Sequence, residues 1–178
     1  GYPVPRPLLE RATAYLDYIA NQPTEGLADL RARAYAAYLL TRTGKVTTRT
    51  LADITAQLDS YHSQAWKTDI TAAYLAASYA LLKQDDSARK LLAGVPWREL
   101  GQERGQYSIY YDALVHDTTL LTLIARHFPA ETKKVPAELL DRFGEKISRN
   151  EYHSLSAANL IRAMDLYDAQ VASNGDLK

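Results

Sequence analysis

Histidine is the residue type best able to do chemistry in this sequence, because the chain has no cysteine and so no thiolate nucleophile, disulfide or Cys-type zinc site. The four histidines are His62, His116, His127 and His153. A common helical zinc site needs two histidines four residues apart, as in His-Glu-x-x-His, and no such pair occurs. The histidines therefore do not predict a zinc site of that type.

A looser set of His and Asp residues leaves one catalytic alternative open. His116 and Asp117 are adjacent, with His62 upstream and Asp165 downstream. All-helical metal-dependent phosphohydrolases use separated His and Asp side chains to hold metal ions that activate water. A bare His-Asp dipeptide also arises often by chance. The sequence therefore favours a structural role, in which Asp117 pairs or caps inside a helical stack and His116 is partly exposed.

Other catalytic signatures are missing from the sequence. There is no Gly-x-Ser-x-Gly motif, and no strand–turn–helix pattern that could strain a serine into a nucleophile. The eight glycines are scattered, and the segment 101–105 carries Glu103 where a phosphate would lie. We therefore expect no catalysis, no cofactor and no metal in this chain.

The composition bounds the class of protein. The chain has 178 residues, 21 Lys and Arg against 21 Asp and Glu, and 47% hydrophobic residues, which is ordinary for a globular protein. A formal net charge of zero argues against nucleic acid as the main partner. No apolar run reaches the roughly 20 residues that a membrane helix needs, so no membrane contact is expected. The chain does not begin with Met, and residues 1–178 read as one all-α domain or domain fragment from a longer protein.

A helical period runs through most of the sequence. Apolar residues recur at helical spacing, and proline, glycine and capping residues separate the segments. The predicted helices span about 7–19, 28–43, 48 or 50 to 61, 69–82, 86–92, 112–127, 136–149 and 154–172. Few β-branched runs alternate with a period of two, so no strand is predicted. The sequence therefore predicts an all-α fold.

The helices also repeat along the chain. Similar triplets begin at Tyr38, Ala80 and Thr122, at intervals of 42 residues. That period fits a helical hairpin with its turns, and each hairpin leaves an apolar face that only a neighbour can cover. Either part of a closed α/α toroid or an open α-solenoid satisfies this need. The second, fourth, sixth and eighth predicted helices are the more apolar, which favours a toroid with those helices inside.

One long connection is a candidate contact surface. Tyrosine is unusually common, at 13 residues against two phenylalanines, and buried rings with a solvated hydroxyl explain most tyrosines. The stretch 97–111 is long for a helical connection and mixes aromatic residues with arginine, as the centres of protein interfaces do. The candidate inter-domain contact residues are Trp97, Arg98, Arg104, Tyr107, Tyr110 and Tyr111.

Three segments resemble the bacterial α2-macroglobulin family. The run 105–129, GQYSIYYDALVHDTTLLTLIARHFP, has a tyrosine-bearing approach to an apolar helix. The segment 152–160 resembles the start of a helix that recurs in the family's thioester-type domain. The segment 32–44 is similar to the family's Ala-Tyr-Ala-Leu-Tyr-x-Leu-Ala-x-x-Gly. Together the similarity extends over about 7–172.

The resemblance implies an α/α toroid domain within a very long periplasmic protein, often anchored as a lipoprotein and acting in host defence. Family members trap proteases after cleavage of a bait region, so they are endopeptidase inhibitors. The implied partners are neighbouring β-sandwich macroglobulin modules of the same chain and, through the whole protein, target proteases. The alternative is an α-solenoid scaffold that binds proteins or peptides.

The sequence departs from the family pattern in two places. The Cys-x-Glu-Gln thioester motif is absent from this chain, and residues 154–157 lack the Gln and Glu of the family's Ser-Thr-Gln-Glu. No catalytic residue is therefore carried over from the family. What the resemblance implies for this chain is a structural role, in which the domain packs against neighbouring modules.

Overall fold

The structure is a computed structural model that describes residues 3–95 and 111–174. The chain folds as two compact units, residues 1–95 and 96–178. In the described ranges the regular elements are helices, and no β-strand is found. The predicted all-α fold class is confirmed, while the expectation of a single domain stays a prediction.

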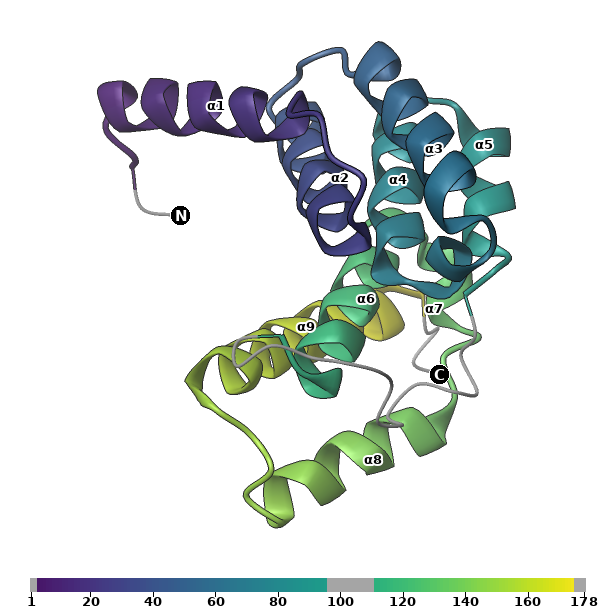
Figure 1. Ribbon diagram of the computed structural model, residues 1–178. Coiled ribbons are helices and arrows are strands. Elements are labelled where there is room, and N and C mark those ends of the chain that lie inside the picture. Colours follow the sequence, from purple (N-terminus) through teal and green to yellow (C-terminus); the bar gives the residue numbers. More distant parts are fainter. Residues whose placement is uncertain (1–2, 96–110, 175–178) are drawn as a thin grey trace. The chain divides into compact units, whose positions relative to one another are not determined.

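Unit 1 contains five α-helices and a short 3₁₀ helix (Figure 1). They are α1 Arg6–Ala20, α2 Leu27–Arg42, α3 Thr48–His62, η1 Ala65–Thr68, α4 Ile70–Leu81 and α5 Asp85–Leu92. Each α-helix begins within about two residues of its predicted start. Proline, Asp or Thr residues mark the starts of α1, α3, α4 and α5, whereas Gly26 precedes α2. The 3₁₀ helix was not predicted, because a single turn has too few residues to show a period.

Helix α4 is the centre of unit 1. Its residues from Ile70 to Ser78 are all buried, and it packs against α2, α5 and η1. Contacts at the start of both helices, between Arg31 and Asp69, and further along, between Tyr35 and Tyr74, show that α2 and α4 run parallel. Two helices that were predicted to lie inside a toroid therefore do pack directly on each other, while α3 lies on α2 and η1.

Turns in unit 1 follow their local chemistry. Gly44 follows α2 with φ of 91°, a conformation that glycine adopts at little cost. A Cβ at Gly44 would meet no atom within 4 Å, so the need for glycine there comes from the backbone alone. The prediction that Gly44 ends this helix is confirmed.

A buried arginine on α2 forms hydrogen bonds with the end of α1 and with α3. Arg33 is 3% exposed, and its Nε donates to the carbonyl oxygen of Ala20 at 3.0 Å. Its Nη1 donates to Gln57 Oε1 and its Nη2 to Asp53 Oδ2, each at 2.7 Å. The guanidinium therefore satisfies a carbonyl at the C-terminal end of α1, where a cation is favoured.

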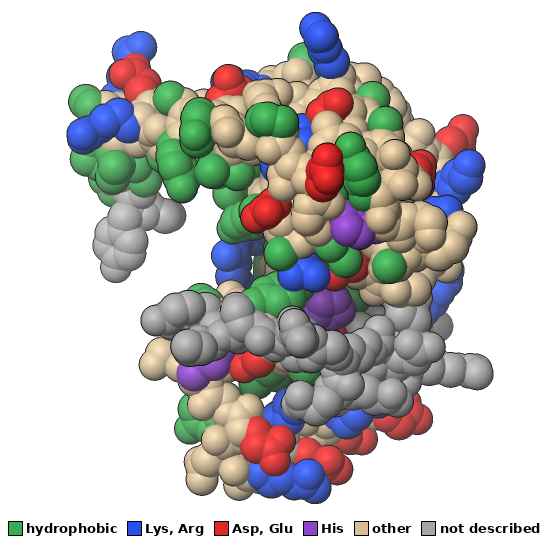
Figure 2. Space-filling model, in the orientation of Figure 1, with side chains coloured by type: hydrophobic (Ala, Val, Ile, Leu, Met, Phe, Trp, Pro, Cys, Tyr) green, Lys and Arg blue, Asp and Glu red, His purple; other side chains and the backbone are tan. Residues whose placement is uncertain are grey.

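Most of α1 nevertheless lies outside the core. Ala20 is its only buried residue, and α1 projects away from α3, α4 and α5 (Figure 1). Large apolar side chains on and just before α1 are exposed, and Figure 2 shows them as hydrophobic surface along that helix. They are Val4, Leu8, Leu9, Tyr15 and Tyr18.

Unit 2 contains four α-helices within residues 111–174. They are α6 Ala113–His127, α7 Pro129–Thr132, α8 Ala137–Ser148 and α9 Ser154–Asn174. Helix α6 is buried along most of its length and packs against α9. Because Asp112 and His153, just before these two helices, contact each other and α7 also contacts α9, α6 and α9 run parallel.

Parallel packing of alternate helices in each unit supports the predicted helical hairpins. The intervening helix returns the chain to the starting end, which is the geometry that both a toroid and a solenoid require. The one-turn helix α7 was not predicted, for the same reason as η1. In the described ranges, no helix is long and apolar enough to cross a membrane.

Candidate functional site

The N-terminal ends of α2 and α4 are joined by a bidentate ion pair. The Arg31 guanidinium donates from Nε to Asp69 Oδ1 at 3.0 Å and from Nη2 to Asp69 Oδ2 at 2.5 Å. The two side chains are 25% and 13% exposed, so the pair is largely shielded from solvent. Since the planar fork of arginine matches the two carboxylate oxygens, this pair fixes the register of the two helices.

Asp69 is also the N-cap of α4. Its Oδ1 accepts hydrogen bonds from the Thr71 backbone N–H at 2.9 Å and from Thr71 Oγ1 at 2.5 Å. Burial alone would raise the pKa of Asp69, but the hydrogen bonds and charge of Arg31, together with Thr71, hold that pKa below its usual value. The carboxylate is therefore ionised and engaged with protein donors, which is a structural role.

Three tyrosine rings pack together beside this pair. The Tyr74 ring lies 5.1 Å from that of Tyr35 and 5.9 Å from that of Tyr38, between centroids. Burial raises the pKa of Tyr74 far above its usual range, with Tyr35 and Tyr38 adding to the shift. Tyr74 and Tyr38 are buried whereas Tyr35 is 44% exposed, so these tyrosines reach from the core to its rim, as predicted.

Unit 2 carries a related arrangement at the start of its two packed helices. Asp112 is the N-cap of α6, and its Oδ1 accepts from the Val115 backbone N–H at 2.7 Å. Its Oδ2 lies 3.1 Å from His153 Nε2. His153 precedes α9, where Ser156 Oγ accepts from the His153 N–H at 2.9 Å and the Ser156 N–H donates to His153 Nδ1 at 3.3 Å. This cluster orders the starts of both helices.

The His and Asp residues of the phosphohydrolase alternative do not form one described cluster. His116 Nδ1 lies 2.7 Å from Asp117 Oδ1, and both side chains are buried in α6. His62 lies in unit 1, with its Nε2 2.6 Å from the Glu25 carbonyl oxygen, and Asp165 is exposed on α9. Among the residues that the structure describes, no three His, Asp or Glu side chains are arranged to hold a metal ion.

One detail of that expectation is wrong. His116 was expected to be partly exposed, but it is only 7% exposed. Helix α6 is buried over more of its circumference than its sequence period indicates, and the neighbouring Asp117 carboxylate supplies a hydrogen-bond partner for the imidazole. The pairing of Asp117 inside the helical stack is confirmed.

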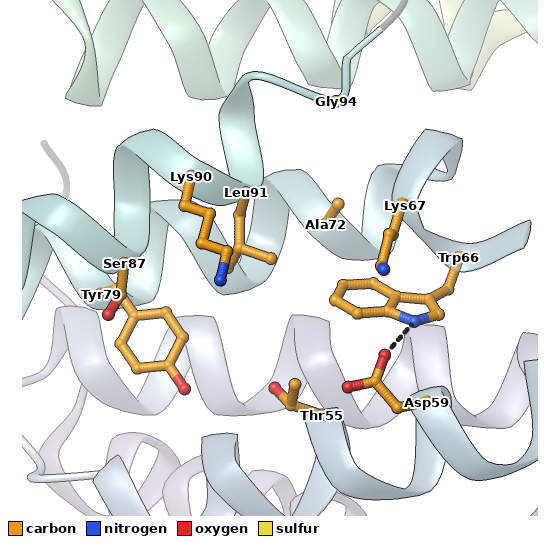
Figure 3. Close-up of a pocket in the computed structure, with 10 residues that line it drawn as sticks. All are labelled: Thr55, Asp59, Trp66, Lys67, Ala72, Tyr79, Ser87, Lys90, Leu91 and Gly94. Atoms are coloured by element: carbon orange, nitrogen blue, oxygen red, sulfur yellow. Dashed lines mark hydrogen bonds between the residues drawn. The ribbon is translucent and has the colours of Figure 1, made fainter. Parts of the chain in front are cut away.

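A groove in unit 1 is lined by side chains other than those of the ion pairs and N-caps described above. It has a volume of about 340 Å³ and lies between α3, η1, α4 and α5 (Figure 3). The residues lining it are Thr55, Asp59, Trp66, Lys67, Ala72, Tyr79, Ser87, Lys90, Leu91 and Gly94. Asp59 Oδ1 accepts a hydrogen bond from Trp66 Nε1 at 3.1 Å. We take this groove as the candidate binding site.

Of the predicted inter-domain contact residues, the structure describes Tyr111. Its side chain is half-buried, and its ring lies 6.2 Å from the His116 ring in an edge-on arrangement. The other five, which lie outside the described residues, are Trp97, Arg98, Arg104, Tyr107 and Tyr110. Their role in a contact stays a prediction.

Sequence reasoning missed the groove and the Arg31–Asp69 pair. The two partners in the pair are 38 residues apart, and only the parallel packing of α2 and α4 brings them together. A partial signal existed, because Asp directly before an apolar helix indicates an N-cap carboxylate. The groove had no such signal, since its lining residues come from four separate elements.

Comparison with known proteins identifies the family. The chain is 40% identical to an alpha-2-macroglobulin homolog of Yersinia pestis over 99% of its length, and 41% identical to alpha-2-macroglobulin of Pasteurella multocida over 83%. It is 34% identical to alpha-2-macroglobulin of Rickettsia conorii over 92%. It spans 9%, 8% and 8% of those three proteins, respectively.

No protein-family model matches the chain, and no solved structure matches it significantly. The three relatives nevertheless agree with the resemblance carried by segments 32–44, 105–129 and 152–160. On this similarity over most of its residues, the chain belongs to the bacterial α2-macroglobulin-like family, whose members extend far beyond the length that it spans.

Proposed function

We propose that this chain is an interaction segment of a bacterial α2-macroglobulin-like protease trap and catalyses no reaction itself. The single observation that supports the proposal is the 34–41% sequence identity between this chain, over most of its length, and bacterial proteins named alpha-2-macroglobulin. The whole protein is then an endopeptidase inhibitor whose partners are target proteases. It lies in the periplasm, with a lipoprotein anchor, and acts in host defence.

The engagement of the polar side chains supports a role without catalysis. Asp69, Asp112 and Asp117 each pair with a cation or an imidazole within their own unit. A carboxylate held by such partners is a poor general base or metal ligand unless those partners move away. These groups instead order the helices that present the surface of the segment.

The exposed apolar side chains of α1 support contact with other parts of the whole protein. Leu8 and Leu9 are 52% and 50% exposed, and single exposed leucines are ordinary. Here, however, exposed Tyr15 and Tyr18 lie on the same helix. Among the described elements, the main packing partner of this helix is α2. We propose that neighbouring β-sandwich modules of the same polypeptide contact two parts of this chain, α1 and the stretch 97–111.

The test uses the whole protein and two substitutions on α1, Leu8→Ser with Leu9→Ser. The matched control is Val46→Ser, which changes an apolar residue that is 83% exposed between α2 and α3. We expect faster limited proteolysis between modules and weaker protease inhibition for the α1 variant, with the control unchanged. Equal proteolysis rates and equal inhibition for the α1 variant and the control would show that α1 is not part of the interface. If the unmodified whole protein does not inhibit proteases, the proposal of a protease trap is wrong.

A further inference from the structure

The groove of unit 1 has a buried floor and an exposed rim. Trp66 and Ala72 are buried, whereas Asp59, Ser87 and Lys90 are exposed. Ala72 and Tyr79 both lie on α4 and both line the groove. Because a helix rises about 1.5 Å per residue, the groove follows α4 for roughly 10 Å. That length accommodates about three residues of an extended chain at roughly 3.4 Å each.

The charges in the groove are unbalanced. Within the described part of the chain, neither Lys67 on η1 nor Lys90 on α5 forms an ion pair. Their side chains extend towards the α3 side of the groove, where Thr55 and Asp59 lie (Figure 3). The one carboxylate, Asp59, already accepts a hydrogen bond from Trp66. Among the lining residues that the structure describes, two ammonium groups against one carboxylate give a surplus positive charge beside an apolar floor.

We propose that this groove binds an extended peptide segment by an acidic side chain, which the ammonium groups of Lys67 and Lys90 pair with from both sides. Leu91, which is half-buried, supplies apolar surface for a neighbouring side chain of the peptide, and the buried Trp66 indole forms the floor beneath it. The Tyr79 hydroxyl can donate to or accept from its backbone. Thr55 Oγ1, which already donates to the Leu51 carbonyl oxygen at 2.8 Å, can still accept from a backbone N–H. This binding site is independent of the proposed protease trap.

A glycine keeps the two lysine-bearing elements close together. A Cβ at Gly94 would lie 3.2 Å from the Lys67 carbonyl oxygen, tighter than an ordinary contact. A larger residue at Gly94 therefore requires the end of α5 or the Lys67 backbone to shift by a few tenths of an ångström. The close approach of the chain after α5 to η1, at one end of the groove, therefore depends on Gly94.

Trp66 offers a direct readout of binding. The chain has two tryptophans, so Trp97→Phe leaves Trp66 as the only indole emitter, inside the groove. The probes are an acetylated, amidated hexapeptide of alternating leucine and glutamate, the same peptide with glutamine in place of glutamate, and acetylated, amidated glutamate. The variants are Lys67→Gln and Lys90→Gln in that background, each with its fold checked by circular dichroism. The matched control is Lys133→Gln, an exposed lysine in unit 2.

We expect the acidic hexapeptide to shift Trp66 emission saturably and the glutamine peptide to bind at least about tenfold more weakly. Each groove lysine substitution should weaken binding about fivefold, the size of a partly exposed charge pair, and Lys133→Gln should change nothing. Equal binding of the two peptides, unchanged binding by both groove variants, or no emission change at millimolar peptide would each overturn the proposal. If acetylated, amidated glutamate saturates the Trp66 emission shift at the same concentration as the hexapeptide, the groove does not require a peptide, and the proposed occupant is wrong.

Discussion

The buried arginine of α2 offers the sharpest test of how unit 1 is held together. The change is Arg33→Met, which keeps most of the apolar stem but removes the guanidinium and its three hydrogen bonds, to Ala20, Gln57 and Asp53. Arg33 is 3% exposed, so water cannot readily replace the lost donors. We expect α1 to detach from α2 before the rest of unit 1 unfolds.

The magnitude follows from what each partner becomes after the substitution. Ala20 is fully buried, and leaving a buried acceptor without a donor costs about 1–3 kcal/mol. The Gln57 amide keeps its bond to Asp53, and the Asp53 side chain is 53% exposed, so water solvates both more easily. We therefore expect a loss of about 2–3 kcal/mol in the free energy of unfolding, near the low end for breaking a buried ion pair.

The assay is urea unfolding followed by far-ultraviolet circular dichroism, with limited proteolysis of the 21–26 connection as a local probe. Asp53→Asn is the matched control, because it removes the charge of the exposed partner and leaves the bonds of Arg33 to Ala20 and Gln57. We expect this control to cost below about 1 kcal/mol. A loss in Arg33→Met no larger than that in Asp53→Asn would refute the reasoning, since it would show that the Ala20 carbonyl contributes nothing.

Three further predictions concern helix ends. The pKa of Asp69 in the folded state lies below its ordinary value. Its carboxylate therefore stabilises the fold fully at a pH above the ordinary pKa, and this stabilisation is lost as the pH falls through the folded-state pKa. Asp69→Asn should cost about 2 kcal/mol in the free energy of unfolding at neutral pH and flatten the acid side of a stability–pH curve. Asp112→Ala should cost about 1 kcal/mol through the lost N-cap in urea unfolding, whereas Asp112→Asn should retain most of the stability. Gly44→Ala should cost about 1–2 kcal/mol and lower the thermal midpoint, with Gly44→Asn costing less, because φ there is 91°.

The positions of the long helices were predictable because each has a period and a start signal. In α3 the residues Leu51, Ile54 and Leu58 are spaced to share one face, and all three are buried. Asp69 and Asp112 precede apolar runs, and both are N-caps in the structure. Period and cap are local properties, so one sequence suffices to place a helix that has both.

What the sequence could not supply is the set of partners that meet only after packing. Trp66 lies on a single turn without a period, and its indole donates to a carboxylate on the preceding helix. The burial of His116 depends on how much of the circumference of α6 its neighbours cover, which the spacing of apolar residues understates. In the sequence, Arg33 is an ordinary charged residue of a predicted helix. It is buried because the end of α1 and one face of α3 pack over it, where it contacts Ala20 and Asp53.

The two units start their packed helices with the same N-cap residue, an aspartate, but with different partners for its carboxylate. In each, an N-cap aspartate at the start of one helix meets a cationic or ionisable group at the start of the parallel neighbour, Arg31 for Asp69 and His153 for Asp112. The aspartate gains from the positive end of its own helix dipole, so each carboxylate is stabilised from two sides. Arg31 donates two parallel hydrogen bonds from its planar fork, whereas His153 meets Asp112 through the single nitrogen Nε2. The start of α2 and α4 is therefore held by a bidentate ion pair, and the start of α6 and α9 by a single carboxylate–imidazole contact.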